Sequence, residues 1–575
     1  MKGKMLTNLK VAAALGAAFT ISMTPSFSQD RNQMRSMVVS RHGIVATSQT
    51  LASQAGAQVL ARGGSALDAA IAANAALAVV EPMMNGLGGD LFVIYREAKT
   101  GKLTGLNASG PAPRALTIEF LASKGIRSMP QQGIHSVSVP GAVDGWEMLH
   151  KRFGRLPWRE IFQPAIWHAR NGFPVTEIIQ DAWRANEAKL AADPVARDVY
   201  LRGGKAPAVG ELFRSPGLAS ALELIAEEGA AAFYRGPVAK AILKTSQRLG
   251  GALTAADLAE YRSEWVEPIA TTYRGWKVYE LPPNGQGIAA LQMLNVFETL
   301  PLGKHGPQSA DDLHAKIEAQ KLAYADLARY VADPHFSKVP VAGLLSEPYA
   351  AERAKLIDPR RARCEVSPGN PPLQGAGDTV YLSVVDREGN IASLIQSIFL
   401  AFGSGVAVDQ YGFHLHNRAG LFTLEPGHPN ALAGGKRPFH TIIPGYMEKG
   451  SLHMGFGIMG GLNQAQAHAQ FVSNIADHGM NIQSALEAPR FTKLNFGGCD
   501  VMIESRVPAA VRDALAARGH KVEALGPFAS QVGGGQAVIH DAAAGVNYGA
   551  SDPRKDGAAV PEQAPYFAIP PPPSR

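Results

Sequence analysis

Two hydroxyl side chains, those of Thr379 and Ser397, are predicted to lie side by side at the open end of a β-hairpin. Residues 381–385 have strand composition, residues 387–389 carry a turn signal, and residues 391–395 return as a second strand. A hairpin centred on this turn pairs Thr379 with Ser397. If the chain is cut before Thr379, its hydroxyl becomes that of an N-terminal nucleophile with a second hydroxyl beside it. Taken alone, the pattern is also that of an ordinary hairpin with a threonine at its end.

The composition is that of a folded protein. The chain has 575 residues, of which 46% are hydrophobic and 18% charged, so one or two large globular domains are expected rather than a disordered chain. The net charge of +6 falls once the basic N-terminal segment is removed. Because no cluster of Lys and Arg is interleaved with aromatic residues, no nucleic-acid partner is expected.

The first 28 residues have the pattern of a secretory signal peptide. Three lysines lie within the first ten residues, an apolar run covers 11–19, and Ser26-Phe27-Ser28 has the small-x-small form of a cleavage site. The mature chain is then expected to begin near Gln29, although an uncleaved anchor has the same charges. No other run reaches the length of a membrane span. A periplasmic or secreted protein without a membrane partner is therefore predicted.

The cysteines and histidines give no metal or cofactor signature. Cys364 and Cys499 are the only two cysteines, and a bridge between them is possible but not required in a chain of this length. His414 and His416 alternate on one strand face without a clear acidic third ligand. We therefore predict no metal site and no cofactor.

Several motifs, in their order along the chain, resemble γ-glutamyltranspeptidase (glutathione hydrolase) proenzymes of the N-terminal-nucleophile hydrolase superfamily. The likeness runs from Gly43 to Arg554. The motifs are Gly63 to Ala70, Asn85 to Asp90, Val139 to Gly145, Gly377-Asp378-Thr379 with its hairpin, Phe402 to Gly405, Gly460-Gly461, Ala488 to Phe491 and Gly549 to Arg554. The resemblance implies an α/β (α+β) fold, a four-layer αββα sandwich built from two chains after self-cleavage.

The resemblance also implies a mechanism. Thr379 attacks the carbonyl of Asp378, and an N→O acyl shift followed by hydrolysis divides the mature chain into a large subunit (29–378) and a small catalytic subunit (379–575). The freed α-amine has a reference pKa of about 7.7–8, which suits a general base for the neighbouring hydroxyl. Ser397 then hydrogen-bonds the nucleophile. The enzyme passes an acyl group from a small acyl-amide or γ-glutamyl substrate to water or an amino acceptor.

Two glycines far downstream match the oxyanion hole of the family. Gly460 and Gly461 lack Cβ atoms, so their backbone N–H groups can approach a tetrahedral intermediate closely. A plain Gly-Gly turn has the same sequence.

The substrate-binding positions depart from the family. The arginine that binds the γ-glutamyl carboxylate aligns with Ser109, although Arg114 lies close by in the sequence. After Lys436 to Phe439, the family's Ser-Ser pair is replaced by His440 and Thr441. Arg114, His440 and Thr441 are therefore our candidate substrate-binding residues, with a structural hydrogen bond as the alternative for His440.

The group that binds the substrate's α-ammonium is also changed. Its three positions align with Phe399, Arg418 and Leu421, so an ammonium would meet an arginine instead of an acid. Arg418 could instead pair bidentately with an acyl group that ends in a carboxylate, or serve only as a structural ion pair. This pattern is similar to glutaryl-type cephalosporin acylases and oxamate amidohydrolases. A catalytically dead periplasmic binding protein is the alternative from another class, and a Ser/His/Asp hydrolase lacks its Gly-x-Ser-x-Gly motif.

Overall fold

Two seven-stranded antiparallel sheets lie face to face in the computed structural model, which describes residues 33–367 and 379–566. Sheet A has the order β1 (Val38–Ser40), β18 (Val546–Ser551), β17 (Gly535–Asp541), β13 (Leu452–Ile458), β12 (Gly445–Lys449), β9 (Trp276–Glu280) and β8 (Ile269–Tyr273). Sheet B has the order β19 (Ala558–Pro561), β2 (Ile44–Thr47), β10 (Val380–Val385), β11 (Ile391–Ser397), β3 (Asp90–Arg96), β4 (Leu103–Ala108) and β7 (Glu264–Val266). The predicted signal peptide and Asp378 lie outside the described residues.

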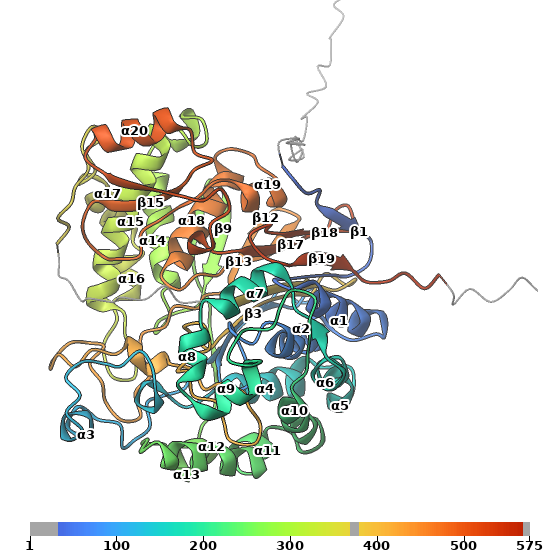
Figure 1. Ribbon diagram of the computed structural model, residues 1–575. Helices are drawn as coiled ribbons and strands as arrows, with labels where there is room; N and C mark the ends of the chain where they lie inside the picture. The colour runs from blue at the N-terminus through green and yellow to red at the C-terminus, as the bar shows by residue number, and fades with distance from the viewer. Residues whose placement is uncertain (1–32, 368–378, 567–575) are drawn as a thin grey trace, which may run out of the picture.

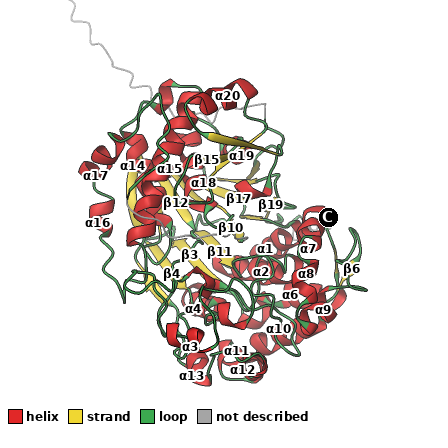
Figure 2. Ribbon diagram, turned by 60° about the vertical axis from the view of Figure 1, so that its left-hand side comes forward, coloured by secondary structure: helices red, strands yellow, loops and turns green. Residues whose placement is uncertain are grey.

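Helices cover the outer face of each sheet, and the result is the predicted four-layer αββα sandwich (Figures 1 and 2). The helices α1 (Thr50–Ala61) and α2 (Ala66–Val80) pack on sheet B. The helices α14 (Gly287–Glu298) and α18 (Asn463–Ala476) pack on sheet A, and α15 (Ala310–Tyr330) packs on α14.

Smaller elements surround these four layers. The other helices are α3 (Ile118–Ser123), α4 (Ala142–Phe153), α5 (Trp158–Ile161), α6 (Gln163–Asn171), α7 (Glu177–Arg184), α8 (Glu187–Ala191), α9 (Pro194–Tyr200), α10 (Pro216–Glu228), α11 (Ala230–Tyr234), α12 (Pro237–Arg248), α13 (Ala255–Ala259), α16 (Val341–Leu344), α17 (Glu347–Ala354), α19 (Ile482–Glu487) and α20 (Ala509–Ala517). The 3-10 turns are η1 (Ile134–Ser136), η2 (Leu302–Lys304), η3 (Arg418–Leu421) and η4 (Ser530–Val532), and the short strands are β5 (Phe173–Pro174), β6 (Leu212–Phe213), β14 (Phe491–Thr492), β15 (Asp500–Glu504) and β16 (Lys521–Leu525).

The helix α2 shows why an alanine-rich segment suits the layer behind sheet B. Ser65 caps the helix in a reciprocal capping box with Asp68, and all of its residues are buried. Small side chains let the helix approach both the sheet and the neighbouring helices closely. Its contact with α1 is an example. The helix is therefore specified by its cap and its small side chains, because it has no polar face.

The predicted hairpin register is confirmed. Val380 pairs with Gln396 and Val385 pairs with Ile391, so the register continued by one residue sets Thr379 opposite Ser397. The strand β10 pairs on its other side with β2, and β11 pairs with β3. The hairpin that begins at Thr379 thus lies in the middle of sheet B, between strands from the earlier part of the chain.

The sequence of residues 140–360 is mostly typical of helices, and the short strands β7, β8 and β9 lie among those helices. β7 and β8 each form one edge of a sheet, and β9 lies next to β8. In β9 the exposed Lys277 stands between the buried Trp276 and Val278, which is the alternation of a strand with one buried face. In the described part of the chain, no helix combines the length and the apolar character that crossing a bilayer requires.

Candidate active site

The side chain of Thr379 is buried between two polar side chains, one from strand β11 and one from helix α18. Its Oγ1 donates to Ser397 Oγ over 3.3 Å and accepts from Gln464 Nε2 over 3.4 Å. The backbone N–H of Phe399 donates to the same Ser397 oxygen over 2.7 Å, which fixes the position of that hydroxyl. Only 1% of Thr379 is exposed. The threonine hydroxyl is therefore held in a defined place by residues of β11 and α18.

The Gly460-Gly461 turn lies between the end of β13 and the start of α18. Both glycines have positive φ angles, 120° and 57°, which only glycine adopts without strain. Among the described residues, no hydrogen bond engages either backbone N–H. Since Gln464 in the first turn of α18 contacts Thr379, these amides and the positive end of the helix dipole lie near the threonine hydroxyl. Backbone N–H groups without a partner are the kind of donor that an oxyanion hole uses.

A buried carboxylate lies beside this pair of hydroxyls. Asp90, the first residue of β3, is the sheet partner of Ser397. Its Oδ2 accepts from His440 Nε2 over 2.9 Å, from His416 Nδ1 over 3.0 Å and from Arg418 Nε over 3.0 Å. Burial alone would raise the pKa of Asp90, but its contacts with His416 and His440 hold it well below its usual value. The cluster therefore carries a buried anion.

Arg418 has one nitrogen without a partner. Its Nη1 donates to Thr441 Oγ1 over 2.8 Å, and its guanidinium lies 4.7 Å from the ring centre of Phe399. In the described part of the chain, Nη2 has no hydrogen-bond acceptor although it is buried. Burial lowers the pKa of Arg418 to about 10, against the charge of Asp90, so the side chain stays protonated at neutral pH. An unsatisfied buried donor of this kind suits an anionic ligand oxygen.

His440 is a neutral member of the cluster. Burial, followed by the charge of Arg418, lowers its pKa to about 3. Its Nδ1 accepts from the backbone N–H of Ile442 over 3.4 Å, and Nε2 donates to Asp90. Both ring nitrogens are thus engaged by the protein.

Comparison with known proteins identifies the family. Residues 52–562 match the Gamma-glutamyltranspeptidase family. The chain is 36% identical over 532 residues to the glutathione hydrolase-like YwrD proenzyme of Bacillus subtilis (strain 168), covering 92% of this chain and all of the relative. It is 35% identical over 538 residues to the oxamate amidohydrolase proenzyme of Klebsiella pneumoniae, covering 92% of this chain and all of that protein. The structure of a cephalosporin acylase from Bacillus halodurans superposes with a TM-score of 0.87 at 42% identity, over 92% of this chain and 97% of that one.

The chain belongs to the gamma-glutamyltranspeptidase family. The predicted family and the predicted fold class are confirmed, and the likeness to the acylase and oxamate amidohydrolase branch is confirmed with them. The protein is a hydrolase proenzyme of this family, with the fold of the N-terminal-nucleophile enzymes.

The structure brings most of the predicted site residues of this family member together. Thr379 contacts Ser397 directly, and Gln464 connects it to the turn that holds Gly460 and Gly461. In the neighbouring cluster, Arg418, His440 and Thr441 surround Asp90 and are all buried; the relevant contacts are Arg418 with Asp90, His440 with Asp90 and Arg418 with Thr441.

Arg114 does not join them. Its side chain is exposed and forms an ion pair with Glu260 over 2.5 Å. The cation next to Ser109 is instead Arg437, whose Nε donates to the Ser109 carbonyl over 3.0 Å and which is 8% exposed. Nearness in the sequence misled the prediction, because the chain turns Arg114 outwards directly after Pro113.

Three residues of the site have no assigned role in the sequence-based prediction. Asp90 ends the Asn85 to Asp90 motif that carries the family resemblance, so the motif was a signal for it. His416 was considered only as a metal ligand, whereas it donates to Asp90. Gln464 lies three residues after Gly461, in the first turn of the helix that the glycines precede, and this spacing was the available signal.

A pocket of about 640 Å³ opens beside the Asp90 cluster. Its wall includes Leu421, which ends the turn that begins with Arg418, and Phe439, which precedes His440. Both pack with Phe399 in one apolar cluster. The pocket has mostly apolar walls with the polar groups of Gln131 and Asn430 among them. Neither Thr379 nor any member of the Asp90 cluster lines it, so the pocket adjoins the cluster only through chain neighbours such as Leu421 and Phe439.

We expect Asp90→Asn to destabilise the protein by about 3–5 kcal/mol, because it leaves Arg418 as an uncompensated buried charge. The measurement is urea unfolding of the Thr379→Ala single chain with and without the second substitution. Glu260→Gln, which breaks the exposed ion pair with Arg114, is the matched control and should leave the midpoint almost unchanged. Equal midpoints for Asp90→Asn and the control would contradict a buried charge cluster.

The same carboxylate sets the sign of a pH dependence. Because the folded-state pKa of Asp90 is depressed, its stabilising effect is complete above the unfolded-state value of about 3.9 and is lost as the pH falls through the lower folded value. The difference between the parent chain and Asp90→Asn should therefore be constant from about pH 5 upwards and shrink only in stronger acid. A difference that shrinks around neutral pH would assign the effect to another group.

Proposed function

We propose that the protein is an exported, self-processing amidohydrolase whose nucleophile is the N-terminal Thr379 of a small catalytic subunit. Cleavage between Asp378 and Thr379 produces the chains 29–378 and 379–575 from one precursor. The observation that carries the proposal is the contact of the Thr379 hydroxyl with both Ser397 and Gln464, beside the glycine turn at the start of α18. The relatives' names, which describe proenzymes, support the cleavage.

The proposed reaction uses only groups of this site. The free α-amine of Thr379 takes the proton of its own hydroxyl, and Oγ1 attacks the carbonyl carbon of the scissile amide. The backbone N–H groups of Gly460 and Gly461 hold the resulting oxyanion, and Ser397 orients Oγ1. The amine then leaves with the transferred proton, and an ester of Thr379 remains. Water or an amino acceptor, activated by the same α-amine, releases the acyl group.

We further propose that the acyl group ends in a carboxylate and lacks a free α-ammonium. The unpartnered Nη2 of buried Arg418 provides a donor for that carboxylate. Leu421 offers no acceptor for an ammonium, and the Asp90 oxygen nearest to Arg418 already accepts three hydrogen bonds. The similarity to a cephalosporin acylase supports an acyl group of the glutaryl type, and oxamate is a second carboxylate-bearing candidate named by a relative.

Hydrolysis of γ-glutamyl compounds such as glutathione is the second candidate function. It is favoured by the name of the glutathione hydrolase-like relative, which aligns over its whole length. A γ-glutamyl group differs from a glutaryl group by one α-ammonium, which Arg418 would repel. The relative turnover of matched anilides therefore separates the two candidates.

Replacing the nucleophile tests the reaction. Thr379→Ala should abolish both self-cleavage and amidase activity, since it removes the only atom that attacks in either step. On a denaturing gel under reducing conditions the variant should run as one band, while the parent protein gives two, the smaller beginning at Thr379 by N-terminal sequencing. Thr379→Ser, which keeps a hydroxyl, should cleave and retain activity. An intact single chain in active parent protein would refute the proposal.

Replacing the guanidinium tests the substrate. Arg418→Lys keeps the positive charge but loses Nη2, and should raise KM for a glutaryl anilide by about 10–100-fold, the range of one charge-assisted hydrogen bond. A pentanoyl anilide, which lacks the carboxylate, should change much less. Arg114→Ala is the control and should alter neither substrate, because Arg114 is exposed and paired with Glu260. Equal losses on both anilides would assign Arg418 a structural role, and faster turnover of a γ-glutamyl anilide by the parent would refute the proposed acyl group.

A further inference from the structure

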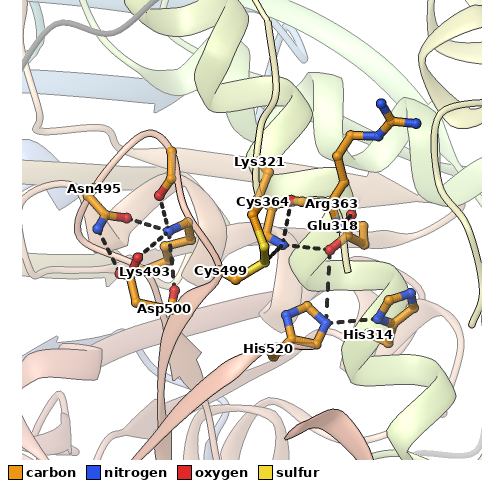
Figure 3. The surroundings of a disulfide bond; sticks show 11 residues. His314, Glu318, Lys321, Arg363, Cys364, Lys493, Asn495, Cys499, Asp500 and His520 are labelled. Carbon is orange, nitrogen blue, oxygen red and sulfur yellow. Dashed lines mark hydrogen bonds and ion pairs between the residues drawn. A yellow bond between two sulfur atoms is a disulfide. The ribbon is translucent and has the colours of Figure 1, made fainter. Parts of the chain in front are cut away.

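A disulfide links the two parts of the chain that lie on either side of Thr379. Cys364 follows α17 and precedes Thr379, whereas Cys499 lies between β14 and β15, and their sulfurs are bonded (Figure 3). Cys364 lies 14 residues before Asp378, the residue on the other side of the proposed cut. The sequence left this bridge open as a possibility, and the structure forms it.

Hydrogen bonds hold the segment around Cys364 against both parts of the protein. Gly498 N donates to the Cys364 carbonyl over 3.0 Å, and Ala362 N donates to the Arg518 carbonyl over 2.7 Å. From the other side, Lys321 Nζ of α15 donates to the Arg363 carbonyl over 3.0 Å (Figure 3). The bridge is therefore part of a fixed contact between residues before and after the proposed cut.

We propose that this disulfide covalently joins the large and small subunits of the mature enzyme. The proposal rests on the cleavage before Thr379: once that peptide bond is hydrolysed, Cys364 belongs to the chain 29–378 and Cys499 to the chain 379–575. The S–S bond then replaces the lost peptide bond as the covalent connection. In the described part of the chain every cysteine is in this bridge, so it is the one disulfide available for the purpose.

The folded enzyme does not need the bridge to hold its subunits together. The strands β10 and β11 of the small subunit lie between β2 and β3 of the large subunit, with backbone hydrogen bonds on both sides. The consequence falls on the unfolded state. Without a bridge, unfolding a cleaved enzyme separates two chains, and refolding depends on their concentration. With the bridge, the partner chain stays at a high effective concentration and refolding is intramolecular.

The surroundings of the two sulfurs determine which one a thiol attacks. Cys364 is exposed, whereas Cys499 is 3% exposed. The ammonium of Lys321, held by Glu318 over 2.6 Å, lies 3.9 Å from Cys499 Sγ (Figure 3). A small thiolate therefore attacks Cys364 Sγ, the S–S bond breaks, and Cys499 leaves as a thiolate beside Lys321. The product is a mixed disulfide on Cys364, and a second thiolate reduces it to the free thiol with release of the small-molecule disulfide.

Two gels of the same purified mature protein test the bridge separately from the cleavage. The protein is denatured with a thiol-blocking reagent and run with and without dithiothreitol. We expect two bands with dithiothreitol, and without it one band that contains both subunits, as N-terminal sequencing of that band should find two N-termini. One band with dithiothreitol would show that cleavage, and with it the proposed function, has failed. Two bands without dithiothreitol would show cleavage but overturn the bridge.

Cys364→Ser is the matched variant. It should cleave itself and keep its amidase activity, because Cys364 is not part of the site, but separate into two bands without dithiothreitol. After unfolding in urea and dilution, the parent should recover the same fraction of activity at protein concentrations that differ 100-fold, whereas the recovered fraction of Cys364→Ser should fall on dilution. Equal concentration dependence would overturn the proposed role in refolding.

Peptide mass analysis tests the direction of thiol attack. Brief treatment of the folded protein with glutathione at mildly alkaline pH, where part of it is thiolate, followed by rapid alkylation, should place the mixed disulfide on Cys364 and the alkyl group on Cys499. The reverse labelling would overturn the assignment of Cys364 as the attacked sulfur.

Discussion

The active site depends on the burial of one carboxylate, that of Asp90. An anion inside a protein is stable only when donors and positive charge surround it, and here Arg418, His416 and His440 all donate to the same oxygen. Asp90 is also the sheet neighbour of Ser397, which contacts Thr379. The position of the anion is therefore tied through one sheet pairing to the position of the threonine hydroxyl. Because Asp90 pairs with Ser397, the side chains that compensate its charge also lie close to Thr379, the proposed nucleophile.

The two sheets contribute different parts of the candidate site. Thr379 and Ser397 come from the central hairpin of sheet B, whereas the glycine turn follows β13 of sheet A. The contact between Gln464 and Thr379 joins the hairpin of sheet B to α18, which packs on sheet A. The candidate site is therefore complete only when the two sheets and α18 are packed together. On the proposed function, a chain that has not folded would not cleave itself.

Local sequence patterns predicted those elements whose side chains alternate over a few residues, such as the strands of the hairpin. The hairpin follows from alternation and one turn, and its register is fixed by two-residue periodicity, which set Ser397 opposite Thr379. The contact between Arg418 and Asp90 joins residues 328 positions apart, and no local period encodes it. For the same reason Arg114 was expected in the site although Arg437 lies beside Ser109. The strands β8 and β9 have only five residues each and lie among the helices of residues 140–360, so their alternation is too short to stand out.

Different kinds of structure position the reacting groups and the substrate-binding groups. The proposed nucleophile Thr379, its hydroxyl partner Ser397 and the glycine turn lie at the ends of regular elements, where backbone hydrogen bonds fix them. Arg418 lies in a four-residue turn, and Thr441 follows in a segment between η3 and β12. Such segments tolerate substitution more readily than a sheet interior does. On the proposed function, the groups around the acyl pocket could therefore change while Thr379 keeps its place in the sheet.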